Sequence, residues 1–161
     1  MERLFSELNG FVIFDPVVLN DYLRDNNLDN DDILSYLINS EHGDKIVKLG
    51  IVIPILNLPT DYYAFEVGSH EVINELKKSE GWVMNSLSGI CQIIGVGYLK
   101  DKTTIANAPK ITINLKKGCY RVSITSFYSS LITPTFMLNF ILVDNEVQSY
   151  GDIETDYGFE Y

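Results

Sequence analysis

The second half of the chain alternates apolar and polar residues with a period of two. Every second side chain is apolar over residues 111–115, and the alternation resumes over residues 120–125. Between these runs lies Lys116-Lys117-Gly118, a connector with turn-forming composition. A period of two places alternate side chains on opposite faces of an extended strand. The pattern therefore predicts two strands joined as a β-hairpin.

Further strands are expected on both sides of this hairpin. Residues 136–143 are apolar at every position except Asn139, which is typical of a strand covered on both faces. After a polar turn at 144–146, residues 147–153 are expected to return beside that strand. Three more apolar runs are strand candidates: 62–67, 82–87, and 90–99, the last interrupted by two glycines.

Three short helices are expected in the first half. Asp15 followed by Pro16 predicts a helix from residue 16 to about 25, because proline at the first helical position loses no hydrogen bond. Asn30 is a candidate N-cap for a helix over 31–40. Ser69 is a third candidate N-cap, with Gly81 just beyond the helix end.

These elements predict a mainly β protein, an antiparallel β-sandwich with two or three short helices in the N-terminal half. At least seven strands are expected, and an α+β single sheet is the alternative. The length of 161 residues fits a single domain over 1–161. Within it, residues 152–161 are expected to form a flexible or partner-binding C-terminal tail.

Charge restricts the partners of the chain. The formal net charge is −10, and residues 144–161 contain six acidic residues and no basic residue. Binding to a phosphate backbone depends on lysine and arginine, so neither nucleic acid nor an anionic membrane surface is an expected partner. We find no targeting segment and no apolar run long enough to span a membrane, and we expect a cytoplasmic protein.

The sequence offers no assembled catalytic or metal-binding motif. His42 and His70 lack the spacing of metal ligands, and Cys91 and Cys119 are expected to be free thiols. The acidic run 25–32 departs from the calcium-loop pattern and is interpreted as a polar loop, with adventitious calcium binding as the alternative. We therefore expect no enzyme activity, no catalytic residue, no metal and no cofactor.

The C-terminal segment carries the candidate binding residues. Residues 150–161 interleave four acidic with four aromatic residues. Carboxylates attract a basic partner, and tyrosines give rigid contact area at small entropic cost. The alternative is an exposed edge strand whose acidic residues prevent aggregation. The predicted partner-binding residues are Tyr150, Asp152, Glu154, Asp156, Tyr157, Glu160 and Tyr161.

Two stretches resemble known bacterial inhibitor families. Residues 111–124, ITINLKKGCYRVSI, with a further strand ending near Val143, resemble the C-terminal hairpin of the DNA-entry nuclease inhibitors of bacterial competence. They also resemble immunity proteins, including those of contact-dependent growth inhibition. Residues 40–55, SEHGDKIVKLGIVIPI, resemble in general style the immunity proteins of polymorphic toxins. The resemblance implies a specific cognate partner that is inhibited by occlusion.

The leading hypothesis is therefore an immunity or inhibitor protein that occludes a cognate, basic, nuclease-type toxin. A second hypothesis is a small-ligand or carbohydrate-binding β-sandwich, in which Trp82, Phe127, Tyr128 and Phe136 line a groove. A third is an enzyme with a dispersed acid and base, such as His70 with Glu66.

Overall fold

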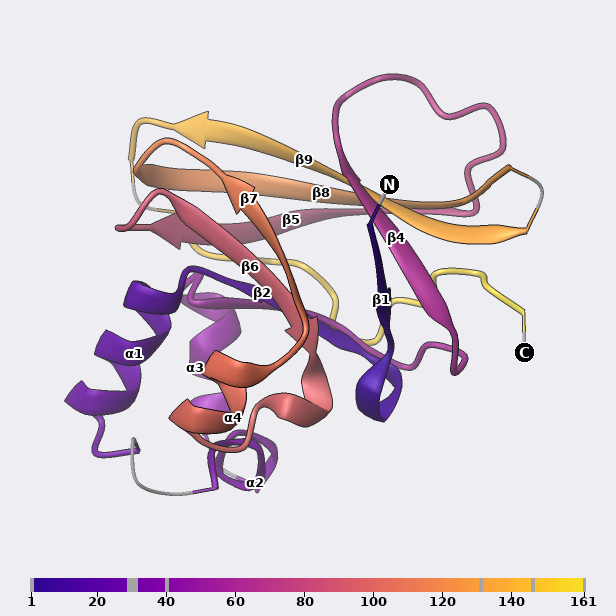
Figure 1. Ribbon diagram of the computed structural model, residues 1–161. Helices are drawn as coiled ribbons and strands as arrows, with labels where there is room; N and C mark the ends of the chain where they lie inside the picture. The colour runs from indigo at the N-terminus through magenta and orange to yellow at the C-terminus, as the bar shows by residue number, and fades with distance from the viewer. Residues whose placement is uncertain (1, 29–31, 40, 131, 146, 161) are drawn as a thin grey trace.

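Two β-sheets face each other in the computed structural model, which describes residues 2–28, 32–39, 41–130, 132–145 and 147–160 (Figure 1). The larger sheet has the order β1-β4-β9-β8-β5 and the smaller one β3-β2-β6-β7. The larger sheet contains β1 (Arg3–Phe5), β4 (Tyr62–Val67), β5 (Lys77–Ser86), β8 (Gly118–Ser129) and β9 (Thr133–Val143). The smaller sheet contains β2 (Phe11–Phe14), β3 (Val52–Ile55), β6 (Ile90–Gly95) and β7 (Lys110–Asn114).

The predicted mainly β fold is confirmed. Every strand pair is antiparallel except β4 with β9, which run parallel. Phe11, Ile13 and Ile53 of the smaller sheet belong to one buried cluster with Phe65 and Phe136 of the larger sheet. The rings of Phe65 and Phe136 stack with centroids 5.5 Å apart. The two sheets therefore enclose an aromatic core, as in a sandwich.

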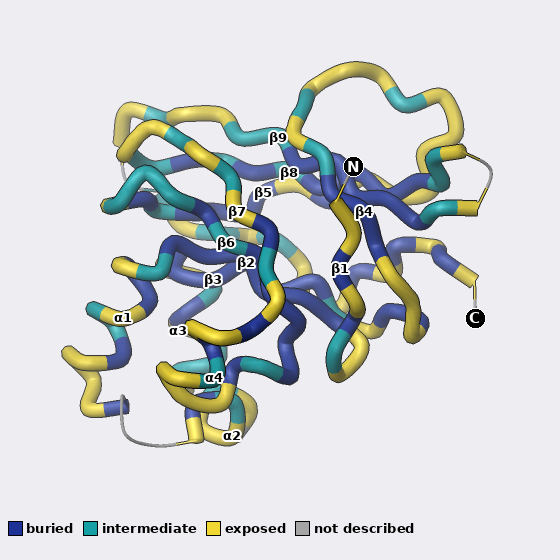
Figure 2. The backbone as a smooth tube through the Cα atoms, viewed as in Figure 1, coloured by how far each residue is buried: buried dark blue, intermediate teal, exposed yellow. Residues whose placement is uncertain are grey.

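Four α-helices cover the other face of the smaller sheet (Figures 1 and 2). They are α1 (Pro16–Asp25), α2 (Ile33–Asn39), α3 (His42–Lys48) and α4 (Lys102–Asn107). Val12 and Phe14 of β2 pack in this second cluster with Leu19, Leu23 and Ile46 from the helices. Two 3₁₀ turns, η1 (Glu7–Asn9) and η2 (Val96–Tyr98), complete the described elements.

The predicted hairpin over 111–125 is wrong, although both of its strands exist. β7 pairs with β6 in the smaller sheet, whereas β8 pairs with β5 and β9 in the larger one. The connector at Lys116-Lys117-Gly118 therefore carries the chain from one sheet to the other. Alternation identifies a strand with one buried face, but it does not identify the strand that pairs with it.

The helix predicted from Ser69 toward Gly81 is also wrong. Its apolar stripe has nothing to bury it, since Ile73 is 93% exposed. From Lys77 the chain instead pairs with β8. Gly81, with φ +84°, lies where the register shifts between Ser79 and Trp82, so it marks a β-bulge and not a helix end.

Gly43, a residue type that favours a helix end, lies instead inside α3, a helix that the sequence does not predict. A Cβ atom at Gly43 would lie 2.0 Å from the carbonyl oxygen of Leu37, so the glycine allows α3 to approach α2. α4 and the 3₁₀ turn η2 at the end of the predicted strand 90–99 were likewise not expected. The calcium-loop candidate at 25–32 lies partly outside the described residues, and Asp32 accepts a hydrogen bond from the backbone N–H of Ser35.

The end of β9 and the chain after it differ from the prediction as well. Ile141 and Leu142 are about half exposed, so the strand is not covered on both faces along its whole length. Residues 147–153 form no strand beside β9. They pass the bulge of β5 instead, where the N–H of Tyr150 donates to the carbonyl of Gly81 at 3.0 Å.

One buried carboxylate joins α1 to the turn between β5 and β6. Asp15 is fully buried and caps α1 by accepting from the N–H groups of Val17 and Val18. Its second oxygen accepts from the hydroxyl of Ser86 and the N–H groups of Leu87 and Ser88, each at 2.9 Å. Burial by itself raises the pKa of Asp15, but these donors outweigh it and the pKa lies below its ordinary value.

None of the helices in the described part of the chain is long and apolar enough to cross a membrane.

We predict that Asp15→Asn lowers the free energy of unfolding by about 3 kcal/mol, measured by urea denaturation. The amide retains an oxygen for the helix cap, but its NH₂ group faces donors from Ser86, Leu87 and Ser88. The matched control is Asp101→Asn, because Asp101 is the exposed cap of α4 and its side chain accepts from the N–H of Thr104 within the same helix. Equal effects of the two substitutions would contradict this account.

The Asp15 carboxylate also makes the free energy of unfolding depend on pH. A group whose folded pKa is depressed contributes stability that is present above its unfolded pKa and is lost as the pH falls through the folded pKa. We therefore expect the stability difference between the wild type and Asp15→Asn to be full above about pH 5 and to shrink below about pH 4. Urea denaturation across this range measures it, and a pH-independent difference would disprove it.

Candidate protein-binding surface

The C-terminal segment is held against the larger sheet at the bulge of β5. The carbonyl of Gly81 accepts from the N–H of Tyr150 at 3.0 Å, from Nη1 of Arg121 at 3.1 Å and from the hydroxyl of Ser149 at 3.3 Å. Nη1 of Arg121 also donates to the carbonyl of Gln148 at 3.0 Å. We call the segment over residues 148–160 the C-terminal strap.

The strap then continues beneath the inner face of the larger sheet (Figure 1). Gly151 lies so close to the indole of Trp82 that a Cβ atom there would be 2.3 Å from the ring. Further along, the hydroxyl of Ser126 donates to the carbonyl of Tyr157 at 2.6 Å. The ring of Phe159 packs edge-on against Tyr63 and Tyr128. The strap therefore forms part of the core.

Side chains along the strap alternate between the core and solvent. Thr155, Tyr157 and Phe159 are buried, whereas Glu154, Asp156 and Glu160 are exposed. Over residues 154–160, anchoring Thr155, Tyr157 and Phe159 in the core leaves their neighbours on the solvent side, because neighbouring side chains of an extended chain point to opposite sides. Figure 2 shows the change of colour along this segment.

The exposed carboxylates of the strap form a row, which we call the carboxylate row: Asp152, Glu154, Asp156 and Glu160. The structure records no ion pair for any of them within the residues it describes. Asp152 and Asp156 each accept a backbone N–H two residues on, from Glu154 and Gly158. These turns fix the backbone beneath the row and leave carboxylate oxygens open to solvent.

The predicted tyrosine anchors divide into three cases. Tyr150 is 72% exposed and lies under the guanidinium of Arg121, 4.8 Å from the ring centroid. Tyr157 is 3% exposed, so its expected role as a surface anchor is wrong and it anchors the strap to the core. Burial raises the pKa of Tyr157 to about 12. Tyr161 lies outside the described residues.

The aromatic residues proposed for a ligand groove belong mostly to the core. Trp82 and Phe136 are fully buried and Phe127 is 9% exposed, while Tyr128 is partly buried against the core. The indole N–H of Trp82 donates to the hydroxyl of Ser79 at 2.7 Å. A groove that needs these rings at its surface is therefore not formed.

The remaining candidate catalytic and metal-binding residues do not form one cluster. His70 and Glu66 do meet, with Nε2 3.3 Å from Oε1, on the outer face of the larger sheet. His42 instead contacts the hydroxyl of Tyr22 through Nδ1 at 2.8 Å. Cys91 and Cys119 are free, as expected. Within the described residues, no group of three or more His, Cys, Asp or Glu side chains is placed to hold a metal ion.

The sequence alone does not indicate two features of this surface. Arg121 fastens the strap, but in the sequence it is one polar residue of an alternating strand. A hollow of about 450 Å³ beside the strap depends on α3, whose existence was not predicted. No local motif marks either feature, because both arise from segments far apart in the chain.

We predict that Gly151→Ala loosens the strap, because the new methyl group meets the rigid indole of Trp82. Amide hydrogen exchange over residues 149–159 should accelerate at least about tenfold, with a loss of about 2 kcal/mol in the free energy of unfolding. Gly68→Ala is the matched control, since its methyl group meets the exposed His70 ring at 3.2 Å and that ring can move. Unchanged exchange in Gly151→Ala would show that the contact does not hold the strap.

The fold has a counterpart among solved structures. No family model matches the chain, and no curated protein is similar to it in sequence. Among solved structures, the chain is similar to the crystal structure of ComJ from Bacillus subtilis, described as an inhibitor of the DNA-degrading activity of NucA. The TM-score is 0.52 at 13% sequence identity, over 88% of this chain and 94% of that one. The two proteins therefore share a fold.

Proposed function

We propose that this protein inhibits a nuclease by binding and covering a basic surface of that enzyme. Its fold is that of a chain described as a nuclease inhibitor, and its net charge is −10. Nucleases that hold DNA or RNA need a cationic surface for the phosphate backbone. A protein that presents negative charge at that surface competes with the substrate for the same groups.

The observation that carries the proposal is the alternation along the C-terminal strap. Tyr157 and Phe159 hold the segment in the core while Asp152, Glu154 and Asp156 face solvent. Carboxylates on an ordered backbone lose little conformational freedom when a partner binds. They also attract a cationic partner over a distance and raise its association rate. The row is thus suited to a fast and specific protein contact.

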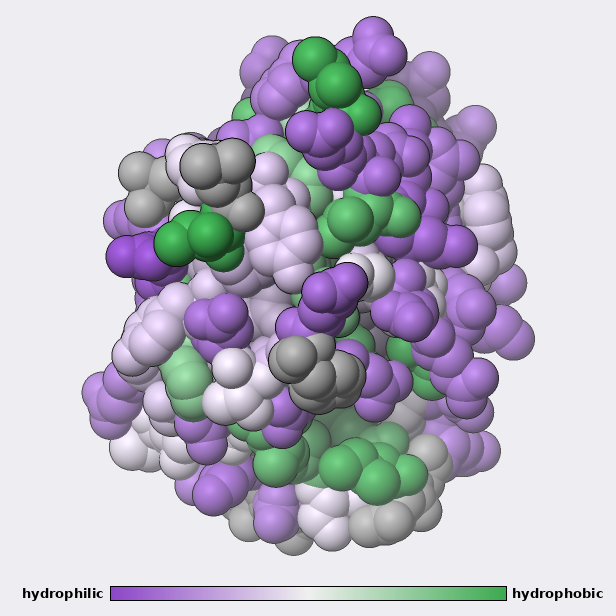
Figure 3. Space-filling view, turned by 90° about the vertical axis from the view of Figure 1, so that its right-hand side faces the viewer, coloured by the Kyte–Doolittle hydropathy of each residue, from purple (hydrophilic) through white to green (hydrophobic). Residues whose placement is uncertain are grey.

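Tyr150 extends this surface at one end. Its ring is exposed but is held by the guanidinium of Arg121, so it is a rigid aromatic contact beside the first carboxylate. Figure 3 shows the side of the molecule at the right of Figure 1, where separate apolar patches lie among hydrophilic groups. Such scattered apolar groups are ordinary for a monomer surface.

Inhibition is proposed to occur by occlusion and not by turnover. The strap contributes charge and shape, and no bond is made or broken in either protein. Complex formation should therefore be stoichiometric, reversible and weakened by salt, since salt screens exposed charges. The test is titration of this protein into DNA-degradation assays of NucA and of any nuclease encoded beside its gene. Inhibition that saturates at one equivalent of either enzyme supports the proposal, and full activity of both overturns it.

We predict that the triple variant Asp152→Asn, Glu154→Gln, Asp156→Asn weakens inhibition at least about tenfold, mainly through slower association. The loss should shrink as salt is raised. Asparagine still accepts the backbone N–H groups of Glu154 and Gly158, so the strap keeps its turns. Point variants are needed because truncation after Ser149 removes Tyr157 and Phe159 from the core.

The matched control for that variant is Glu2→Gln, Glu71→Gln, Asp144→Asn, which removes three exposed charges from outside the C-terminal strap. If both triple variants lose inhibition equally, total charge and not the carboxylate row decides binding. Thermal unfolding of both proteins checks that the fold is unchanged.

A further inference from the structure

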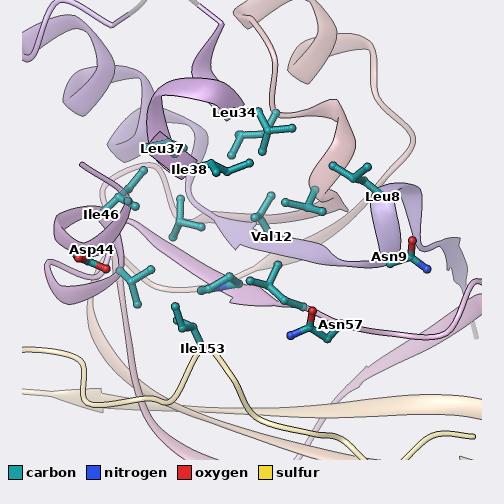
Figure 4. A pocket seen from close by; sticks show the side chains of 17 residues that line it. Leu8, Asn9, Val12, Leu34, Leu37, Ile38, Asp44, Ile46, Asn57 and Ile153 are labelled. Atoms are coloured by element: carbon teal, nitrogen blue, oxygen red, sulfur yellow. The ribbon is translucent and has the colours of Figure 1, made fainter. Parts of the chain in front are cut away.

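An apolar pocket of about 450 Å³ lies between the helices and the C-terminal strap (Figure 4). α2 forms one side of it, and Ile153 of the strap points toward it from the opposite side. Of the 17 lining residues, all but four are apolar, the four being Asn9, Gly43, Asp44 and Asn57. A hollow of this size and lining is typical of a binding site.

Two side chains at the pocket remain largely exposed. Ile38 on α2 is 67% exposed and Leu8 on η1 is 60% exposed, yet both line the hollow. Neither residue belongs to a buried cluster of the described chain. Single exposed apolar residues are ordinary, but these two border the same apolar hollow, as the residues of a binding site do.

Leu8 is also held in an unfavourable backbone conformation. Its φ is +56° and its ψ is +33°, in the left-handed region that leucine adopts at a cost of about 1–2 kcal/mol. The next residue fixes this turn, because the amide of Asn9 donates to the carbonyl of Leu58 at 2.9 Å and to the hydroxyl of Thr60 at 2.8 Å. Such strain gathers at functional sites.

Carboxylates border the pocket. Asp44 lies in its wall, and an adjoining hollow of about 340 Å³ shares Asp44 and Ile153 and adds Asp152 and Lys48. Neither Asp44 nor Asp152 has a recorded ion pair within the described residues. Because Asp152 begins the carboxylate row, the apolar pocket and the negative strip form one continuous surface.

We infer that the pocket receives an apolar side chain of the protein partner, next to lysine or arginine residues of that partner that reach Asp44 and Asp152. This inference rests on the proposed function and specifies which partner segment the surface recognises. An apolar anchor surrounded by charged contacts is the usual arrangement of an energetically dominant interface residue. The border holds two carboxylates, Asp44 and Asp152, and one ammonium group, that of Lys48, so its net negative charge favours this occupant over a fatty acid.

The first test compares Ile38→Arg with Ile73→Arg in the nuclease-inhibition titration. Both replace an exposed isoleucine and add the same charge, but Ile73 lies in the β4–β5 loop away from the pocket. We expect Ile38→Arg to weaken inhibition about 30-fold and Ile73→Arg to stay within about twofold of the wild type. Ile38→Met should retain inhibition, since methionine is apolar and adaptable.

The second test uses Leu8→Asn, which we expect to raise the stability of this protein and to weaken its inhibition of the nuclease. Asparagine tolerates the left-handed conformation, so its thermal unfolding midpoint should rise. It also removes an apolar wall of the pocket, so its inhibition should weaken about tenfold. If Leu8 had only a structural role, a substitution that raises stability would not also weaken inhibition.

Inhibition by the wild type together with equal effects of Ile38→Arg and Ile73→Arg would refute the pocket and leave the proposed function standing. Absence of inhibition by the wild type would refute the proposed function itself. Sedimentation of the wild type alone provides the remaining control. A dimer that Ile38→Arg converts to a monomer would assign the pocket to a second copy of the chain and overturn the inference.

Discussion

The inner face of the larger sheet extends beyond the area that the smaller sheet covers. β8, β9 and β5 contain 12, 11 and 10 residues, whereas the longest strand of the smaller sheet, β6, contains six. Uncovered aromatic rings on a sheet lose the stabilisation that burial provides. The C-terminal strap covers this area, with Tyr157 and Phe159 against Phe136. The need to complete the core therefore sets the position of the strap.

Local signals in the sequence predict the elements whose ends are fixed by local chemistry. Asp15 and Pro16 place the start of α1 correctly, because a cap and a proline act within one turn of helix. The run 62–67 matches β4 for a similar reason, since it is short and lies between Asp61 and Gly68, residue types that are depleted in strands. The mainly β fold follows from the number of such strands. These features need no knowledge of distant contacts.

Features that depend on distant contacts were not predictable. Gly43 and Gly81 both suggest a helix end locally, yet one lets two helices approach and the other forms a bulge. The candidate site likewise combines features that the local sequence indicates with features that depend on distant contacts. Its acidic residues could be listed from the sequence, but the inward direction of Tyr157 depends on Phe136 and Ser126, which lie about twenty to thirty residues earlier.

The proposed interface combines two kinds of surface that meet at one residue pair. Ile153 turns toward the apolar pocket, while its neighbour Asp152 begins the carboxylate row. Electrostatic attraction acts over about 8–10 Å in physiological salt, so it governs approach. Apolar contact acts at van der Waals distance, so it governs dissociation. On a surface of this kind, the association rate and the dissociation rate are set by different residues.

The alternation of the strap also has an evolutionary consequence. Replacement of an outward-facing residue changes stability by no more than about 0.5 kcal/mol, whereas loss of an inward aromatic costs about 3–5 kcal/mol. Mutation can therefore alter the charge pattern at positions 152, 154, 156 and 160 while selection for folding preserves 157 and 159. Sequences with this architecture can therefore change the charges that they present to the proposed partner while the fold is retained.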